Sequence, residues 1–143
     1  MREILFRGKC NEVGKYNGQW IEGFYGEDDG KPIIARSTDN GLIGYFCEPY
    51  SIGQYTGLTD KNGKKIFEGD ILEGIRYGNE ARAEVLWIDK AASWGIRYSF
   101  RGKNESGYTS WLNSAWFRTI EDARAPVVIG NIHDNPELLE VSK

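Results

Sequence analysis

Residues 53–70, GQYTGLTDKNGKKIFEGD, carry the strongest local structure signal in the chain. A β-type run enters at residues 52–56, the cluster Asp-Lys-Asn-Gly at 60–63 reverses the chain, and residues 65–67 form a second β-type run. Asn-Gly is the strongest short hairpin signal because both residues tolerate positive φ. Asp60 can add an Asx turn, so we predict a hairpin with a longer loop. We expect it to join two β subdomains and to supply no catalytic group.

The composition around this hairpin favours a mainly β protein. The 143 residues include 18 Gly, and aromatic residues reach 13%. Frequent glycine between short apolar runs predicts tight turns and short strands, and aromatic enrichment points the same way. The net charge of -3 and the pI near 5.3 lower the expectation of duplex binding, since phosphate neutralisation needs a basic surface.

The cysteine spacing and the N-terminal residues predict the setting. Cys10 and Cys47 form no C-x-x-C pair and have no metal-ligand spacing. The first residues hold charges and no apolar run, which indicates neither a signal peptide nor a membrane span. We therefore expect a cytoplasmic protein with reduced, buried thiols that act as small apolar residues.

The first sixty residues read as an antiparallel meander. Alternation in residues 2–9 predicts a strand with Ile4 and Phe6 inward and Arg7 outward. In the next strand, residues 19–25, Trp20 and Phe24 share one face because their spacing is even. Further strands of this subdomain are predicted at residues 32–35 and 42–46.

The remaining residues read as an SH3-like partial barrel that packs on the meander. Strands are predicted at residues 71–73, 82–88, 94–100 and 127–132. Residues 110–124 have apolar residues near helical spacing, and we favour a helix there over two short strands. Asn135 as N-cap, Pro136 and Glu137 predict a short C-terminal helix.

Few residues offer chemistry. His133, the single histidine, has no partner that the sequence would orient toward it, so a structural role is expected. Glu68 and Asp70 share a strand face and are compatible with a hard cation, which leaves a metal-dependent hydrolase as a distant alternative. A solvated strand edge has the same pattern. We predict no catalytic residue, no metal site and no cofactor.

The surplus of aromatic residues is the richest functional signal. We predict that some are exposed, and that the candidate contact surface comprises Trp94, Arg97, Tyr98, Arg101 and Trp111. Tyr, Trp and Arg are enriched at protein interfaces, and aromatic residues beside arginine also stack single-stranded bases. In an acidic chain the interface is favoured over single-stranded nucleic acid, which remains the alternative function.

Five blocks of the chain form a specific combination: MREILFRGK at 1–9, WIEG at 20–23, GQYTGLTDKNG at 53–63, IFEGDI at 66–71 and VIGNIHDNPELL at 128–139. Together these blocks resemble the YopX family. The resemblance implies a small phage- or prophage-encoded protein, mainly β with an SH3-like part, and no established biochemical activity. It thus implies a single YopX-like domain over residues 1–143, with subdomains near 1–60 and 61–143.

Together these observations predict an accessory protein in the cytoplasm of the bacterial host. We expect it to be no enzyme and to act through protein contacts. Its predicted partners are a second copy of itself, as a homo-oligomer, and an unidentified host or phage protein.

Overall fold

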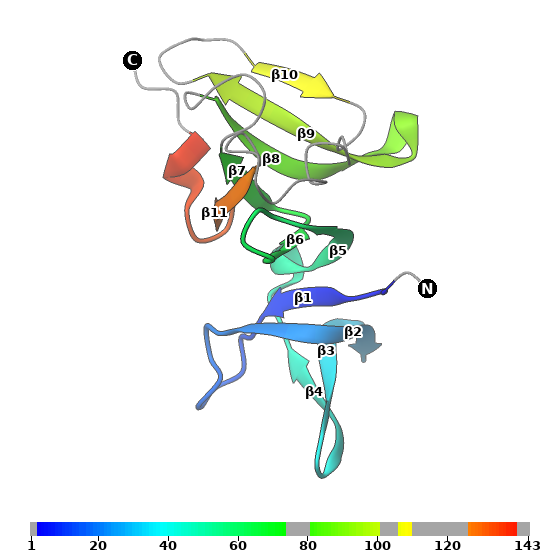
Figure 1. Cartoon of the computed structure of the whole chain (residues 1–143). Helices are drawn as coiled ribbons and strands as arrows, with labels where there is room; N and C mark the ends of the chain where they lie inside the picture. The colour runs from blue at the N-terminus through cyan, green and yellow to red at the C-terminus, as the bar shows by residue number, and fades with distance from the viewer. Residues whose placement is uncertain (1–2, 74–80, 101–105, 110–125, 140–143) are drawn as a thin grey trace. The chain divides into compact units, whose positions relative to one another are not determined.

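The computed structural model describes residues 3–73, 81–100, 106–109 and 126–139 (Figure 1). The chain divides into two compact units, Met1–Gly57 and Leu58–Lys143, and the division falls inside one strand. The described residues are mainly strands in two antiparallel sheets, with no α-helix among them, which confirms the mainly β prediction.

The first unit is an antiparallel sheet in the order β4-β3-β2-β1-β5. Its elements are β1 (Phe6–Lys9), β2 (Trp20–Asp28), β3 (Lys31–Thr38), β4 (Gly41–Phe46), the 3-10 turn η1 (Pro49–Ser51) and β5 (Gly53–Thr59). Asp29 and Gly30 connect β2 to β3 with φ values of 51° and 76°. Two positive φ values are what a tight hairpin turn requires, so this turn matches the right-handed twist of its strands.

The core of the first unit lies on one face of this sheet. Ile21, Ile34 and Tyr45 come from three neighbouring strands and are buried together with Cys10 and Cys47. The register places Tyr25 opposite Ile34 and Ile34 opposite Tyr45, and paired residues of an antiparallel sheet share a face. The core therefore follows from alternation along β2, β3 and β4.

Two predicted orientations in the first strand are wrong. Arg7, predicted to face outward, is only 8% exposed, and its guanidinium carbon lies 4.7 Å from the centre of the Trp20 ring. Ile4, predicted to face inward, is 59% exposed because β1 begins only at Phe6. The Trp20 ring covers the Arg7 guanidinium, and the cation is attracted to the aromatic face. The alternation pattern of a single strand cannot predict such a contact, because Trp20 belongs to the neighbouring strand.

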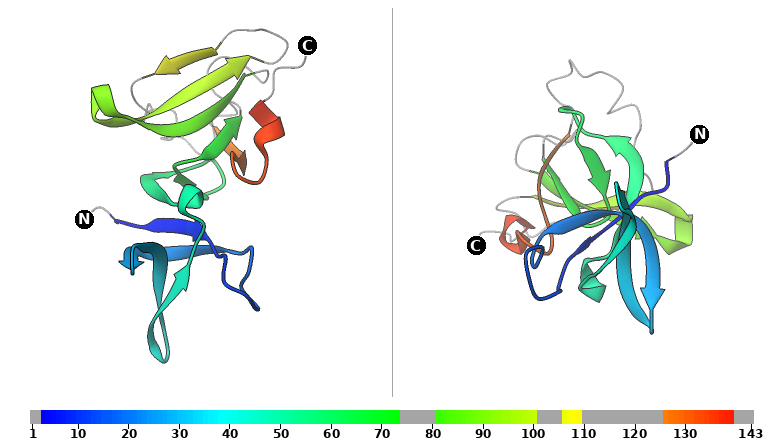
Figure 2. Two further views of the ribbon diagram at one scale, coloured as in Figure 1. Left: turned by 180° about the vertical axis from the view of Figure 1, so that it is seen from behind. Right: turned by 90° about the horizontal axis from the view of Figure 1, so that it is seen from below.

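The second unit contains a five-stranded antiparallel sheet in the order β10-β9-β8-β7-β11 (Figure 2). The described elements of the second unit are β6 (Lys65–Phe67), β7 (Asp70–Glu73), β8 (Ala81–Ile88), the 3-10 turn η2 (Asp89–Ala91), β9 (Ser93–Phe100), β10 (Ser106–Thr109), β11 (Val127–Asn131) and the 3-10 turn η4 (Pro136–Leu139). Strand β6 is not part of the five-stranded sheet. The buried core of this unit contains Ile66, Leu72, Ala83, Val85, Ile96 and Val128. Side chains at alternate positions of β8 and β9 thus form its centre.

The predicted C-terminal helix is a single 3-10 turn. Pro136 begins this turn as expected, and the Asn135 carbonyl accepts the first hydrogen bond of the turn from the Leu138 N–H at 3.1 Å. The Asn135 side chain accepts a hydrogen bond from the Asn131 backbone N–H at 3.3 Å. Arg82 holds the turn from β8 by donating to the Leu138 carbonyl at 3.0 Å and to Glu73 Oε2 at 3.0 Å. No helical turn in the described ranges has the length and apolar character needed to cross a membrane.

Two further expectations are not tested by the described residues and stay predictions. The helix over residues 110–124 lies outside the described residues. The SH3-like form of the second unit is untested, because an antiparallel five-strand order is common to several β folds.

The predicted Asx turn at Asp60 is present and anchors the second unit. Asp60 is 5% exposed, and its Oδ1 accepts hydrogen bonds from the backbone N–H groups of Asn62 at 2.8 Å and Lys64 at 2.9 Å. Its Oδ2 accepts from the Val128 N–H at 3.0 Å, a bond that spans 68 positions. One carboxylate therefore closes the β5–β6 turn and attaches β11 to it.

We expect Asp60→Asn to lower the free energy of unfolding by about 2–3 kcal/mol. An amide has one acceptor oxygen, so buried N–H groups lose a charge-assisted bond and one of them faces another donor. Urea denaturation followed by tryptophan fluorescence measures the change. Asp39→Asn, at an exposed turn position, is the matched control and should change stability by less than about 0.5 kcal/mol. Equal effects of both variants would contradict the anchoring role.

Gly23 allows β2 and β3 to pack closely. A Cβ at this position would collide with the backbone carbonyl oxygen of Ala35, which cannot move without disturbing the ladder. We expect Gly23→Ala to destabilise the first unit by about 2 kcal/mol. Gly26→Ala, in the same strand, meets its nearest atom at 3.5 Å and should be well tolerated. Thermal denaturation of both variants tests this difference, and similar melting temperatures would refute it.

Candidate functional site

The predicted contact surface does not lie on one sheet face. Trp94 belongs to the core face of β9, because it is paired with Trp87 in a register that also pairs Val85 with Ile96. Arg97 is three positions further along the strand, so it lies on the opposite face. Tyr98 is opposite Ala83 in the backbone register, and Arg101 and Trp111 lie outside the described residues.

The two described side chains of that surface are engaged within the second unit. Trp94 packs against the core and meets Trp87 edge-on, with ring centres 5.2 Å apart. Arg97 forms an ion pair with Glu84, with 2.6 Å between Nη2 and Oε1. Trp87 remains 43% exposed. Strands β8 and β9 thus carry a cross-strand packing pair on one face and a cross-strand ion pair on the other.

The candidate carboxylates Glu68 and Asp70 lie in different structural environments. Asp70 is 1% exposed, and its Oδ2 accepts a hydrogen bond from the Phe67 N–H at 2.8 Å. Glu68 lies in the intervening turn, where Gly69 has a φ of 91°. In the described part of the chain no three metal-ligating side chains gather into a group. Asp70 therefore closes the turn between β6 and β7.

His133 belongs to the same turn region. Its Nε2 lies 3.3 Å from the point that a Cβ would occupy on Gly69, and its backbone N–H donates to Asn131 Oδ1 at 3.0 Å. The imidazole thus lies against a tight turn, the kind of packing role expected from the sequence.

The first unit exposes apolar side chains on both faces of its β2–β3–β4 sheet. Phe24 is 59% exposed and Leu42 is 64% exposed, and the register places both on the face away from the core. Tyr25 and Ile43, on the core face, are 43% and 39% exposed. Sequence reasoning missed this surface because a strand pattern shows which residues share a face and not which face is covered.

Strand β4 also leaves backbone groups at an edge. In the residues that the structure describes, β4 is the last strand of its sheet and has β3 as its one neighbour. Thr38 and Gly41 close the β3–β4 hairpin around a two-residue loop, so they are a hydrogen-bonded pair, as are Arg36 and Ile43. The intervening residues Leu42 and Gly44 therefore direct their N–H and C=O groups away from β3.

At the C-terminal end of β4, the outward backbone groups of Phe46 are hydrogen-bonded within the same unit. The Phe46 N–H donates to Glu12 Oε1 at 2.9 Å, and its carbonyl accepts from the Asn11 N–H at 3.0 Å. A pocket of about 460 Å³ opens here, with Lys31 and Cys47 in its lining. The edge that remains for a partner is thus the short segment from Gly41 to Tyr45.

Both cysteines are free and buried, each with 2% exposure. Burial raises the pKa of the Cys47 thiol to about 11 from its ordinary value of 9.0, and the nearby Cys10 adds to the effect. Since the thiolate is the reactive form, the structure makes Cys47 a poor nucleophile at neutral pH.

We expect iodoacetamide at pH 8 to label Cys47 about 100-fold more slowly in the folded protein than in urea, because the folded thiol is almost fully protonated. Peptide mapping by mass spectrometry measures the rate. The raised folded pKa contributes stability below pH 9.0, which is lost as the pH rises through about 11. Labelling at pH 8 that proceeds equally fast in both states would contradict this environment.

Comparison with known proteins adds the family. The family model described as YopX protein matches residues 5–140, nearly the whole chain. The chain belongs to the YopX family. A crystal structure of protein EF1440 from Enterococcus faecalis is similar to this YopX chain, with a TM-score of 0.54 and 24% sequence identity. The similarity covers 98% of this chain and 100% of that one, and at this identity it shows the fold alone. The search of curated proteins finds no match.

Proposed function

We propose that this YopX chain is a phage or prophage accessory protein that acts through protein contacts and not through catalysis, and that its first partner is a second copy of itself. The observation that carries the proposal is the apolar edge strand β4. Its sequence GLIGYF contains no charged residue, and Leu42 and Ile43 on it are exposed. Natural edge strands usually carry charges, proline or a bulge that prevent pairing.

The pattern of outward backbone groups selects one register for two copies. Leu42 and Gly44 are the two residues that offer N–H and C=O groups to a partner. In an antiparallel pair, Leu42 then lies opposite the partner's Gly44, and Gly44 lies opposite the partner's Leu42. About four backbone hydrogen bonds form, and a two-fold axis passes between the two copies of Ile43.

Side chains favour the same arrangement. The two Ile43 residues form a non-hydrogen-bonded pair, in which cross-strand side chains approach most closely. Like charges cannot meet along the edge, because β4 carries none. Leu42 and Phe24 add exposed apolar side chains on the outer face of the same sheet.

The test places charges on the two-fold axis. We expect the wild-type chain to dimerise in a light-scattering concentration series, and chains with Ile43→Lys to remain monomeric because two lysines would face each other. Chains with Ile43→Glu should also be monomeric, and an equimolar mixture of the two variants should restore the dimer. Circular dichroism checks that each variant is folded.

Val13→Lys is the matched control, since Val13 is a fully exposed apolar residue of the same unit outside β4. It should leave the dimer intact. A monomeric wild-type chain, or charge variants that dimerise as well as wild type, would overturn the proposal.

A further inference from the structure

Two backbone hydrogen bonds place Cys10 and Cys47 directly opposite each other. The Glu48 N–H donates to the Lys9 carbonyl at 2.9 Å, and the Asn11 N–H donates to the Phe46 carbonyl at 3.0 Å. These bonds flank the antiparallel bridge between Cys10 and Cys47 on both sides. The two cysteines are therefore a non-hydrogen-bonded cross-strand pair.

This pair type brings side chains closest together. Opposed Cα atoms at such positions are about 4.5 Å apart, and disulfides join Cα atoms separated by about 4.4–6.8 Å. Both side chains belong to the same buried cluster, so they lie on the same face of the sheet. A disulfide can close here without moving either strand.

The position of the Cys47 sulfur supports this reach. Gly8 is two residues before Cys10 and thus on the same face of the strand. The Cys47 Sγ lies 3.0 Å from the point that a Cβ on Gly8 would occupy, and it contacts the Tyr45 carbonyl at 3.4 Å. The sulfur therefore lies on the face of the strand that Gly8 and Cys10 share.

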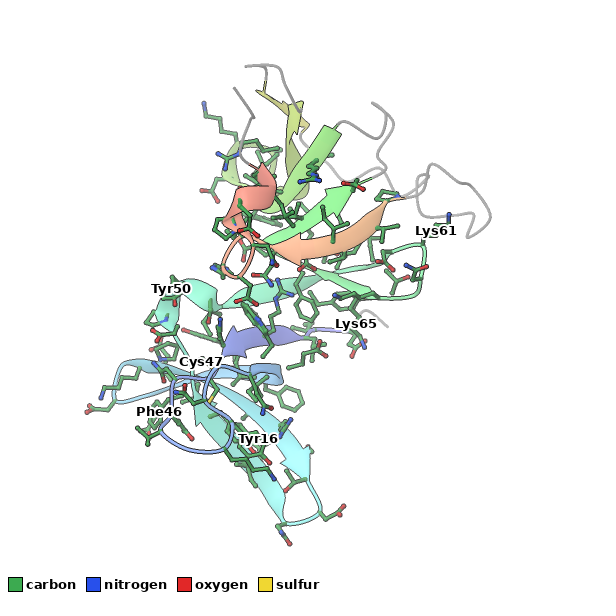
Figure 3. All side chains as sticks on the ribbon, turned by 90° about the vertical axis from the view of Figure 1, so that its left-hand side faces the viewer. Tyr16, Phe46, Cys47, Tyr50, Lys61 and Lys65 are labelled. Carbon is green, nitrogen blue, oxygen red and sulfur yellow. The ribbon has the colours of Figure 1, made fainter. Side chains whose placement is uncertain are left out.

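Access for a small oxidant comes from the pocket at the end of β4. Cys47 is part of its lining, together with Pro32 and Phe46. Phe46 and Cys47 are labelled at this end of the strand in Figure 3. A pocket of about 460 Å³ admits hydrogen peroxide, although Cys47 itself is only 2% exposed.

We propose that Cys10 and Cys47 are a reversible oxidation site, at which hydrogen peroxide converts the two thiols into a cross-strand disulfide. The Cys47 thiol, which lines the pocket, reduces the peroxide through its small thiolate fraction, so the step is slow, and it gives a sulfenic acid and one water molecule. The opposite thiol then attacks the sulfenic sulfur, an S–S bond forms, and the second water molecule leaves. The two thiols lose two protons and two electrons, and the peroxide takes up both to form the two water molecules.

The bridge would stabilise the first unit. It closes a loop that contains β2, β3 and β4, so it constrains the unfolded chain more than the folded one. The dithiol and disulfide forms thus differ in stability and interconvert with the redox conditions.

The experiment treats the purified full chain with hydrogen peroxide and measures its intact mass under denaturing conditions. We expect a loss of two hydrogen masses, no free thiol, and a melting temperature higher by about 10 °C. Dithiothreitol should reverse all three changes. Cys10→Ser and Cys47→Ser are the controls, in which neither the mass loss nor the rise in melting temperature should occur.

A gain of oxygen masses on separate cysteines, a disulfide between two chains, or unchanged free thiols would overturn the proposal. If a serine variant fails to fold, peptide mapping of the oxidised wild-type chain decides, because it identifies the linked Cys10 and Cys47 peptides directly. Self-association through β4 is measured independently, so each proposal can fail alone.

Discussion

The buried carboxylate of Asp60 is the constraint on which the second unit depends. A β turn leaves backbone N–H groups without partners in the ladder, and burial makes each unpaired group costly. Asp60 accepts from two of them within its own turn and from the Val128 N–H at the start of β11. A local turn and a strand that arrives almost seventy residues later therefore share one acceptor group.

In the first unit the decisive feature is a sheet with apolar side chains on both faces. Its core face buries Ile21, Ile34 and Tyr45, whereas Phe24 and Leu42 lie uncovered on the other. An edge strand without charges adds unpaired backbone groups to the same region. This region of the first unit therefore offers main-chain pairing and apolar contact.

The aromatic residues show how far composition leads. Their surplus correctly suggests that some are exposed, but the exposed ones include Phe24, Tyr25 and Trp87, while Trp94 packs on the core. Of the contact surface predicted around β9, Trp94 and Arg97 lie on opposite faces of the sheet, because their positions alternate along the strand. Ile4 is exposed because the strand begins only at Phe6, after the start of the apolar pattern. Arg7 is buried because the Trp20 ring of the neighbouring strand covers it.

The sequence by itself determined the mainly β class, the hairpin after residue 53, the Asx turn at Asp60 and the family. These follow from turn chemistry and alternation, which are local properties of the chain. The tertiary structure decided that Asp60 also binds the Val128 N–H, that β4 is an edge and that Cys10 faces Cys47. Each of these depends on which distant strands become neighbours. Because backbone pairing is satisfied equally by many partners, only the packing of the whole sheet selects among them.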